Sequence, residues 1–334
     1  MGGSRMKPIK VADGVYCLTV PTPFAVGPVN IFIVVDGNRA MMVDAGPKTE
    51  EAWQMLEAGW RELGLNPNQL EAVVLTHHHP DHTGLISYLK NDQPIYGHWR
   101  LWPWLTRDVH FAERYRNYFR SLSVRMGVPN EFLNDSPTID EYLIYGGTGQ
   151  LHAKLDEGDR IPGFEEWQVF YTPGHAQSHI SLLRDDGVFI GGDVLLETIS
   201  SNAILEPPYC DTDAVPYTLL QYRDSLKKCL TLPIRKVLPG HGDAYEFQAS
   251  LIHHKLHEQE KRRDDILQLI KEGPKTALEI GMSLFKNRWQ RQLDLVLSEV
   301  QGHLDWLKVE GLVTVEDVNG AWIYEIHEKA GESL

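Results

Sequence analysis

Residues 72–82 have the sequence Ala-Val-Val-Leu-Thr-His-His-His-Pro-Asp-His, in which a short apolar run leads directly into a cluster of ligand-type side chains. The apolar run is typical of a buried strand, so the following side chains would be presented from a loop at a sheet edge. Neutral imidazoles and a carboxylate suit divalent zinc, iron or manganese. If alternate side chains point to different sides of the loop, the cluster can serve two adjacent ions. The candidate ligands are His77, His79, Asp81 and His82.

Three later turns each place one more ligand-type side chain just past a predicted strand. The residues concerned are His175, Asp193 and His241, and each lies beside glycines that allow the backbone to turn tightly. Sites in layered α/β proteins tend to assemble at strand ends. Any one of these residues could belong to an ordinary turn, but together with the histidine run they indicate one metal site.

The pattern around these motifs is mixed α/β. Early hairpins and a later alternation of strands with helices predict layers of sheet covered by helices. A helix is expected over 48–63. Strands are expected at 11–20, 30–35, 40–43, 72–75, 167–171, 179–183, 188–190 and 236–238.

Two regions depart from that rhythm. Residues of about 99–150 form a helical insertion rich in aromatic residues and arginine, and a compact unit starts near residue 262. In that unit Thr276-x-x-Glu279 is a capping-box pattern, apolar residues recur at helical spacing over 293–307, and Asn319-Gly320 indicates a hairpin. Three helices followed by a hairpin is the order of a winged-helix domain. We therefore expect a catalytic domain over 6–260 and a winged-helix-like domain over 262–330.

On these motifs the sequence resembles the metallo-β-lactamase superfamily. Val43-Asp44-Ala45-Gly46 matches the family's first motif, His77-x-His79-x-Asp81-His82 the second, and His175, Asp193 and His241 the third to fifth, in the family's order. The resemblance spans about residues 11–245. It implies a four-layer αββα sandwich with the site at one edge of the sheets.

The same resemblance implies how the ligands are shared between two divalent ions, with zinc as the first expectation and iron or manganese as alternatives. It implies that His77, His79 and His175 bind one ion and that Asp81, His82 and His241 bind the other. Asp193 would bridge the two ions. Asp44 would lie in the outer shell, where a carboxylate orients ligands.

The expected chemistry is hydrolysis by a hydroxide that the two metals bridge, with Asp81 and Asp193 as the catalytic carboxylates. Two cations about 3.5–4 Å apart lower the pKa of a water molecule towards neutrality and polarise the bond that is attacked. A true β-lactamase is disfavoured, because those enzymes usually lack an aspartate at the Asp193 position. The leading hypothesis is a small ester or thioester substrate.

Charge offers a clue to that substrate. The chain has a formal net charge of −14, which disfavours a protein whose main task is to grip nucleic acid. Residues 100–125 are the exception, with six arginines against Asp108 and Glu113, a balance of +4. Such a segment could attract a small anionic substrate such as a coenzyme A or glutathione thioester, or it could be a solvated helix. The candidate substrate-binding residues are Tyr115, Arg116 and Arg120.

Two alternative functions remain open at this stage. The winged-helix-like tail resembles the group named after β-lactamase-like protein two, some of whose members cleave single-stranded RNA. Residues 261–334, however, carry ten Lys and Arg against thirteen Asp and Glu, a net −3, which favours packing, homodimer formation or capping of the site over nucleic-acid binding. The third hypothesis is a non-hydrolytic module that uses its metals for interaction or redox chemistry.

The remaining features concern location. No stretch approaches the roughly 18 continuous apolar residues of a membrane span, and the N-terminus has no apolar signal core. The three cysteines, Cys17, Cys210 and Cys229, are scattered and indicate reduced thiols rather than a disulfide framework. These features predict a cytoplasmic protein without a membrane partner.

Overall fold

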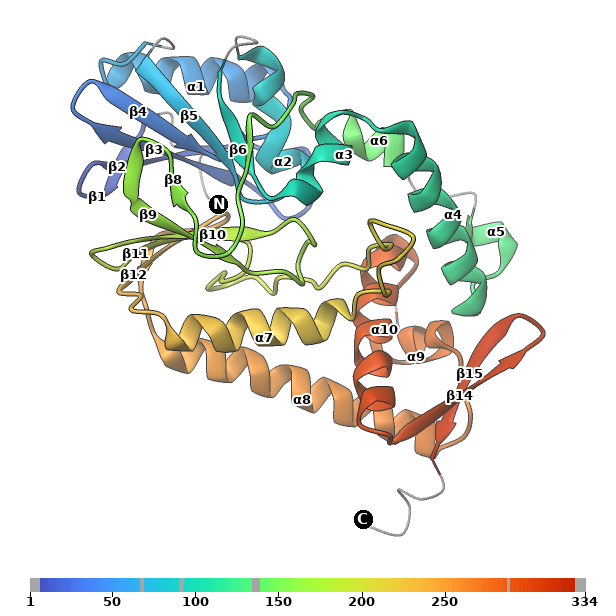
Figure 1. Ribbon diagram of the computed structural model, residues 1–334. Helices are drawn as coiled ribbons and strands as arrows, with labels where there is room; N and C mark the ends of the chain where they lie inside the picture. The colour runs from blue at the N-terminus through green and yellow to red at the C-terminus, as the bar shows by residue number, and fades with distance from the viewer. Residues whose placement is uncertain (1–6, 67–68, 90–92, 134–138, 287–288, 328–334) are drawn as a thin grey trace.

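Two β-sheets lie face to face in the larger part of the molecule, and helices cover the outer face of each sheet (Figure 1). The computed structural model describes residues 7–66, 69–89, 93–133, 139–286 and 289–327. Within them, four layers of helix, sheet, sheet and helix follow one another, which confirms the predicted αββα sandwich.

The first sheet has seven strands in chain order, from β1 to β7. β1 to β4 pair antiparallel through hairpins, whereas β4 to β7 pair parallel across helical connections. The predicted strand over 11–20 is in fact two strands, because Asp13 and Gly14 make a turn. The bounds are β1 Ile9–Ala12, β2 Val15–Val20, β3 Val29–Asp36, β4 Arg39–Val43, β5 Leu70–Leu75, β6 Ile95–Gly97 and β7 Ala153–Lys154.

The second sheet has six strands in the order β13-β12-β11-β10-β9-β8. All its neighbours pair antiparallel except β11 and β12, which are parallel and are connected through α7. The bounds are β8 Arg160–Ile161, β9 Phe164–Tyr171, β10 Ile180–Arg184, β11 Val188–Gly192, β12 Lys236–Pro239 and β13 Tyr245–Glu246.

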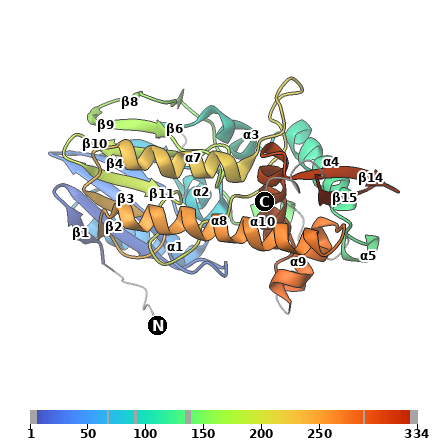
Figure 2. The ribbon, with the colours of Figure 1, turned by 90° about the horizontal axis from the view of Figure 1, so that it is seen from below.

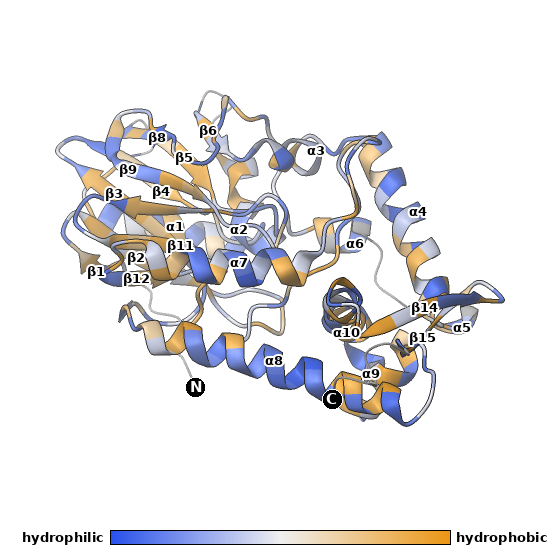
Figure 3. Ribbon diagram, turned by 60° about the horizontal axis from the view of Figure 1, so that its bottom comes forward, coloured by the Kyte–Doolittle hydropathy of each residue, from blue (hydrophilic) through white to orange (hydrophobic). Residues whose placement is uncertain are grey.

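Strand periodicity explains how the layers form. Along β3, Ile31 and Ile33 face the helices that cover the first sheet, while Phe32 and Val34 face the second sheet. Successive side chains of a strand point to opposite faces, so a strand that is apolar at every position can be buried on both. In Figure 3 the strands of both sheets are coloured mostly as hydrophobic.

The covering helices are amphipathic. On the first sheet α1 (Glu50–Glu62) begins at Thr49, whose side chain accepts a hydrogen bond from the Ala52 N–H at 3.2 Å. On the second sheet α7 (Thr218–Thr231) and α8 (Ala249–Lys271) lie side by side (Figure 2). His253, His254 and His257 are exposed on α8.

The predicted insertion is helical. Its longest helix leads away from the sheets towards the C-terminal unit (Figure 1). It begins after β6 with the 3-10 helix η3 (Trp99–Leu101) and α3 (Trp102–Leu105), and continues with α4 (Val109–Arg125), α5 (Asn130–Leu133) and α6 (Ile139–Leu143). Before β6, α2 (Pro80–Thr83) contains the end of the histidine run, and η2 (Gly84–Tyr88) follows it.

The C-terminal unit contains α9 (Ala277–Phe285), η4 (Trp289–Arg291), α10 (Leu293–Val309), β14 (Val313–Val318) and β15 (Ala321–Ile326). The capping box at Thr276 and the hairpin at Asn319-Gly320 are both present, and the winged-helix assignment stays a prediction. α8 runs without a break through residues 260–262, so the expected domain boundary lies within a helix. The unit also shares its apolar core with Leu122 and Met126 of the α4 region. The C-terminal unit therefore packs on the insertion.

No helix among the described residues is long and apolar enough to cross a membrane.

Candidate metal centre

The predicted ligands come together at the strand ends of the two sheets. Asp44 follows β4, the histidine run follows β5, and His175 follows β9. Asp193 and His241 follow the parallel strands β11 and β12. Because all these strands end at the same edge of the sandwich, residues that are far apart in sequence meet there, and every one of the predicted ligands is buried.

Three imidazoles form the first set of ligand atoms, which we name the His77 group: His77, His79 and His175. The Nε2 atom of His77 lies 3.0 Å from Nδ1 of His79, and Nε2 of His175 lies 3.1 Å from that same Nδ1 atom. Tetrahedral zinc with metal–nitrogen bonds of 2.0–2.1 Å needs nitrogens about 3.3 Å apart. Both distances are close to this value, and the three nitrogens lie within 4.8 Å of one another, near enough for one ion to contact all three.

The second set, the Asp81 group, consists of Asp81, His82 and His241. The Nε2 atom of His241 lies 3.5 Å from Oδ2 of Asp81. A carboxylate with two imidazoles is a mixed oxygen and nitrogen ligand set that suits borderline divalent ions.

Asp193 lies between the two groups. Its Oδ2 atom is 3.5 Å from Nε2 of His175 and also 3.5 Å from Nε2 of His241. Its Oδ1 atom is 3.5 Å from Nε2 of His82. One carboxylate therefore reaches nitrogens of both groups.

Three of the imidazoles are held in orientation by hydrogen-bond partners of their Nδ1 atoms, which point away from the cluster. His82 Nδ1 donates to Asp44 Oδ2 at 2.8 Å, and His241 Nδ1 donates to the Pro28 carbonyl at 2.7 Å. His175 Nδ1 lies 2.8 Å from the Asn202 carbonyl and 2.9 Å from Ser201 Oγ. With the proton held on Nδ1, the Nε2 lone pair of each ring is directed into the cluster, as metal binding requires.

Thr76 fixes His77 in the same way. The Thr76 hydroxyl donates to Asp44 Oδ2 at 2.8 Å, so its lone pair accepts from His77 Nδ1 at 2.9 Å. Asp44 has a φ of 62°, a left-handed conformation that few non-glycine residues adopt. This conformation places its carboxylate against His82 and Thr76 together, and strain of this kind is typical of functional sites.

Two buried atoms show that the cluster fits a cation. The Nε2 atom of His82 and the Oδ1 atom of Asp193 have no hydrogen-bond partner among the described residues. Buried polar atoms nearly always have a partner, and a divalent ion would give one to both. The His and Asp groups of this site can therefore bind metal.

Burial and mutual proximity also shift the pKa values of the clustered histidines and of Asp193. Burial lowers the pKa of His77, His79 and His175, which keeps these rings neutral and able to coordinate. Burial also acts to lower the pKa of His82, but the surrounding carboxylates, Asp193 first, outweigh it and raise that pKa well above the usual value. Burial acts to raise the pKa of Asp193, but the neighbouring imidazoles hold it well below its usual value.

Several supporting residues escaped the sequence analysis. Asn30 donates its side-chain amide to the carbonyls of Pro239 and Gly242 at 2.9 and 2.7 Å, which fixes the turn that carries His241. His179 accepts the Asp193 N–H at 3.0 Å through its Nε2 atom. Nothing in the spacing of these residues indicates such pairings.

A second polar network lies next to the turn that carries His175. The buried Glu206 carboxylate accepts the Gln177 N–H and the Tyr209 hydroxyl, both at 2.6 Å. Burial raises the pKa of Glu206 to about 7. The Tyr209 hydroxyl in turn accepts the Trp104 indole N–H at 2.7 Å. The network connects the insertion with the turn that carries His175.

His78, the middle residue of the run, belongs to this outer layer. Its ring stacks on Trp104 with centroids 3.9 Å apart, and its Nδ1 lies 2.9 Å from Ser178 Oγ. His78 therefore contacts Trp104 of the insertion and Ser178.

The predicted substrate residues lie further out. Arg116 is exposed and pairs with Asp140 at 3.4 Å, while Arg120 lines a surface hollow beside the β14–β15 hairpin. Tyr115 packs edge-on against Trp104, with centroids 5.4 Å apart. Only Tyr115 is thus brought next to the layer that surrounds the ligands, and a substrate role for the three residues stays a prediction.

Comparison with known proteins agrees with this geometry. The family model described as the metallo-beta-lactamase superfamily matches residues 25–241. The chain is 35% identical to a probable metallo-hydrolase, YqjP, of Bacillus subtilis (strain 168), over 90% of this chain and 94% of that protein. A solved structure, the metallo-beta-lactamase family protein TTHA1429 from Thermus thermophilus, superposes with a TM-score of 0.79 at 27% identity, covering 95% of this chain and 99% of that one.

Two more distant relatives bear on function. A beta-lactamase-like protein 2 homolog of Drosophila melanogaster is 22% identical over 88% of this chain and 87% of its own, which supports the resemblance to that group. A hydroxyacylglutathione hydrolase of Xylella fastidiosa (strain M12) is 28% identical over 75% of this chain and 68% of its own.

Proposed function

This chain belongs to the metallo-β-lactamase superfamily, and we propose that its buried cluster is a dinuclear centre that hydrolyses a small ester or thioester. The chain is a metal-dependent hydrolase. The observation that carries the dinuclear assignment is the position of Asp193, whose carboxylate lies 3.5 Å from imidazoles of both ligand groups. A shared carboxylate between two complete sets of three ligands is what a two-metal site requires.

In this proposal His77, His79 and His175 hold one ion, Asp81, His82 and His241 hold the other, and Asp193 contacts both. Two bound cations would lower the pKa of a water molecule and polarise the carbonyl group that it attacks. The chain's own contribution is orientation. Asp44 and Thr76 keep the imidazoles of His82 and His77 in the tautomer that coordinates.

Two observations favour an ester or thioester over RNA. The hydroxyacylglutathione hydrolase relative is named for a small thioester substrate. α10, the helix expected to read nucleic acid in a winged-helix domain, instead packs against α7 and α8 and buries most of its length. A Cβ atom on Gly302 would lie 2.8 Å from Leu219 of α7, which shows how close the two helices are.

The test compares substrates on the zinc-loaded full chain and on the metal-free chain. We expect metal-dependent thiol release from a glutathione or coenzyme A thioester and little cleavage of a single-stranded RNA. His241→Ala should abolish this turnover, and His253→Ala, an exposed histidine on α8, should retain it. Efficient RNA cleavage without thioester turnover would support the endoribonuclease alternative. Full turnover in His241→Ala would overturn the ligand assignment.

A further inference from the structure

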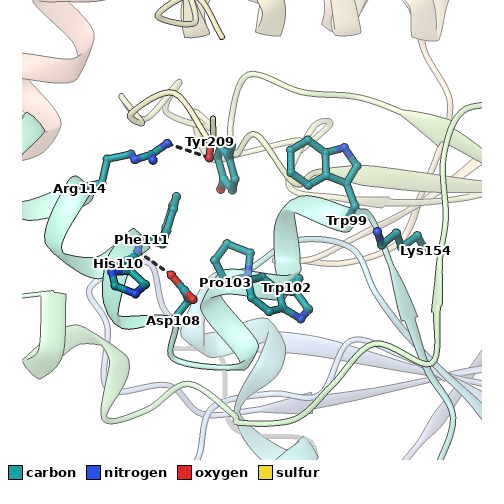
Figure 4. A pocket seen from close by; sticks show the side chains of 9 residues that line it. All are labelled: Trp99, Trp102, Pro103, Asp108, His110, Phe111, Arg114, Lys154 and Tyr209. Carbon is teal, nitrogen blue, oxygen red and sulfur yellow. Dashed lines mark hydrogen bonds between the residues drawn. The ribbon is translucent and has the colours of Figure 1, made fainter. Parts of the chain in front are cut away.

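A cavity of about 320 Å³ opens between the first helices of the insertion and the segment that connects β11 with α7. Figure 4 shows aromatic side chains around it: Trp99, Trp102, Phe111 and Tyr209. Trp102 is 48% exposed, whereas Trp104, two residues further along the chain, is buried. Several rings around one hollow, one of them open to solvent, form a surface on which a planar group can stack.

The polar lining of this cavity is mainly basic. Lys154 lies beside Trp99, and His110 and Arg114 lie on the opposite side (Figure 4). The one carboxylate, Asp108, accepts the Phe111 N–H at 2.7 Å as the cap of α4, so it is already engaged.

Arg114 can bind a new anion at low cost. It donates to the Tyr209 carbonyl at 3.0 Å and pairs at 2.9 Å with Asp211, whose side chain is 92% exposed. An ion pair with so exposed a carboxylate is screened by water and weak, so a ligand phosphate can replace it. The chain as a whole has a formal net charge of −14, but the basic side chains of this cavity favour an anion locally.

Trp104 contacts both the wall of this cavity and a residue of the histidine run. Trp104 contacts Phe111 of the cavity wall with centroids 5.2 Å apart and donates its indole N–H to Tyr209. It also stacks on the ring of His78, which lies between two proposed ligands in the sequence. A long substrate could therefore place one end in the cavity and its reacting bond at the cluster.

We propose that this cavity binds the nucleotide end of the carrier in a thioester substrate, as in an adenine-containing coenzyme A thioester. The base stacks on Trp102 and Trp99, and the phosphates face Lys154 and Arg114. Stacking on aromatic side chains suits any base, and cations supply the phosphate contacts. A glutathione carrier has no ring to stack. The inference rests on the proposed function, because it identifies which carrier that site accepts.

The first experiment measures binding alone, by calorimetric titration of the zinc-loaded full chain with ADP and with inorganic pyrophosphate. ADP should bind more tightly than pyrophosphate, since only ADP carries a base. Trp102→Ala should weaken ADP binding about 5- to 100-fold, the usual effect of losing one stacking ring. Lys154→Ala should weaken it more at low salt than at high salt. Tyr88→Ala removes an aromatic residue that is 38% exposed and packs beside Trp53 of α1, and it should bind ADP as the wild type does.

The second experiment measures the ratio of kcat/KM for a coenzyme A thioester to kcat/KM for a short thioester without a nucleotide. Trp102→Ala should lower this ratio, and Tyr88→Ala should leave it unchanged. ADP affinity that is equal in wild type and Trp102→Ala would overturn the inference even if thioesters are hydrolysed. ADP binding that depends on Trp102 and Lys154, without any thioester turnover, would support the nucleotide pocket and refute only the proposed function. A single-stranded RNA that binds through these residues in preference to coenzyme A would overturn the carrier assignment.

Discussion

The two ligand groups resemble each other in chemistry but are supported by different parts of the molecule. In the Asp81 group, His82 and His241 are oriented by Asp44 and the Pro28 carbonyl, at the ends of core strands of the first sheet. In the His77 group, His175 is oriented by Ser201 and Asn202, which belong to the long segment between β11 and α7.

That segment in turn depends on the C-terminal unit. The Leu205 N–H donates to Ser298 of α10 at 3.4 Å, and the Leu205 side chain is buried in the core that the C-terminal unit shares with α4. Asp44 of the first sheet thus orients His82 directly and His77 through Thr76, whereas His175 is oriented by a segment that packs between the insertion and the C-terminal unit. If two ions bind as proposed, changes in the C-terminal unit should therefore reach the cluster through His175 and leave the contacts of His82 and His241 intact.

The largest effect is expected where the two groups meet. Asp193→Ala removes the carboxylate that contacts both, and should lower turnover by about 10³-fold or more, corresponding to the several kcal/mol that metal activation contributes. Zinc content after dialysis should also fall, while circular dichroism stays close to wild type because the sheets are held by their apolar cores. Asp185→Ala, in an exposed hairpin turn, is the matched control. Turnover near the wild-type rate in Asp193→Ala would remove the basis for a shared carboxylate.

The next prediction concerns Glu206, in the segment between β11 and α7. We expect it to make the free energy of unfolding depend on pH. Burial raises the pKa of Glu206 from 4.5 to about 7, so the folded chain binds a proton that the unfolded chain releases. The stabilisation is fully present below about pH 4.5 and is lost as the pH rises through 7, a change of about 3 kcal/mol. Glu206→Gln stays uncharged and should lack this loss.

The measurement is the free energy of unfolding by urea at several values between pH 5 and 8, for wild type and Glu206→Gln. The two curves should diverge as the pH increases, with the wild type losing stability relative to the variant. Curves that stay parallel over this range would show that Glu206 does not titrate with a raised pKa.

A smaller pair of effects separates the two groups directly. Asp44→Asn keeps a side chain that tolerates the left-handed backbone at this position but removes the charge that His82 contacts. Loss of an outer-shell carboxylate usually weakens metal binding about 10- to 100-fold. The Asp81 group should be affected most, because His77 contacts Asp44 only through Thr76.

Ser201→Ala is the counterpart on the other side. It removes one of two polar contacts of His175 Nδ1 and leaves the Asn202 carbonyl, so the His77 group should lose about 2- to 10-fold in zinc affinity. Stepwise zinc affinities from chelator competition distinguish the two variants. If both variants weakened the same binding step, the two groups would not have separate supports.

Much of the candidate metal centre could be predicted from the sequence because its proposed ligands occur in short local motifs. The run from His77 to His82 follows an apolar strand, and strand ends of a layered fold meet at one edge. The capping box at Thr276 and the hairpin at Asn319-Gly320 depend on neighbouring residues only, and both are present. The outward positions of Arg116 and Arg120 were not visible in the sequence, since charge counts along a helix do not show which side faces the site.

The sequence by itself determined the candidate ligands and the layered sandwich, because residue type and periodicity of 2 or 3.6 act over a few residues and survive any tertiary arrangement. Only the tertiary structure decided which residues surround and support the proposed ligands. Asn30 supports a turn 209 residues away, and Glu206 meets Gln177 across 29 residues. Trp104 joins His78 to an aromatic cavity, and the C-terminal unit shares a core with the insertion. Such contacts form between surfaces that become neighbours only on folding, so no local pattern encodes which residue each one finds.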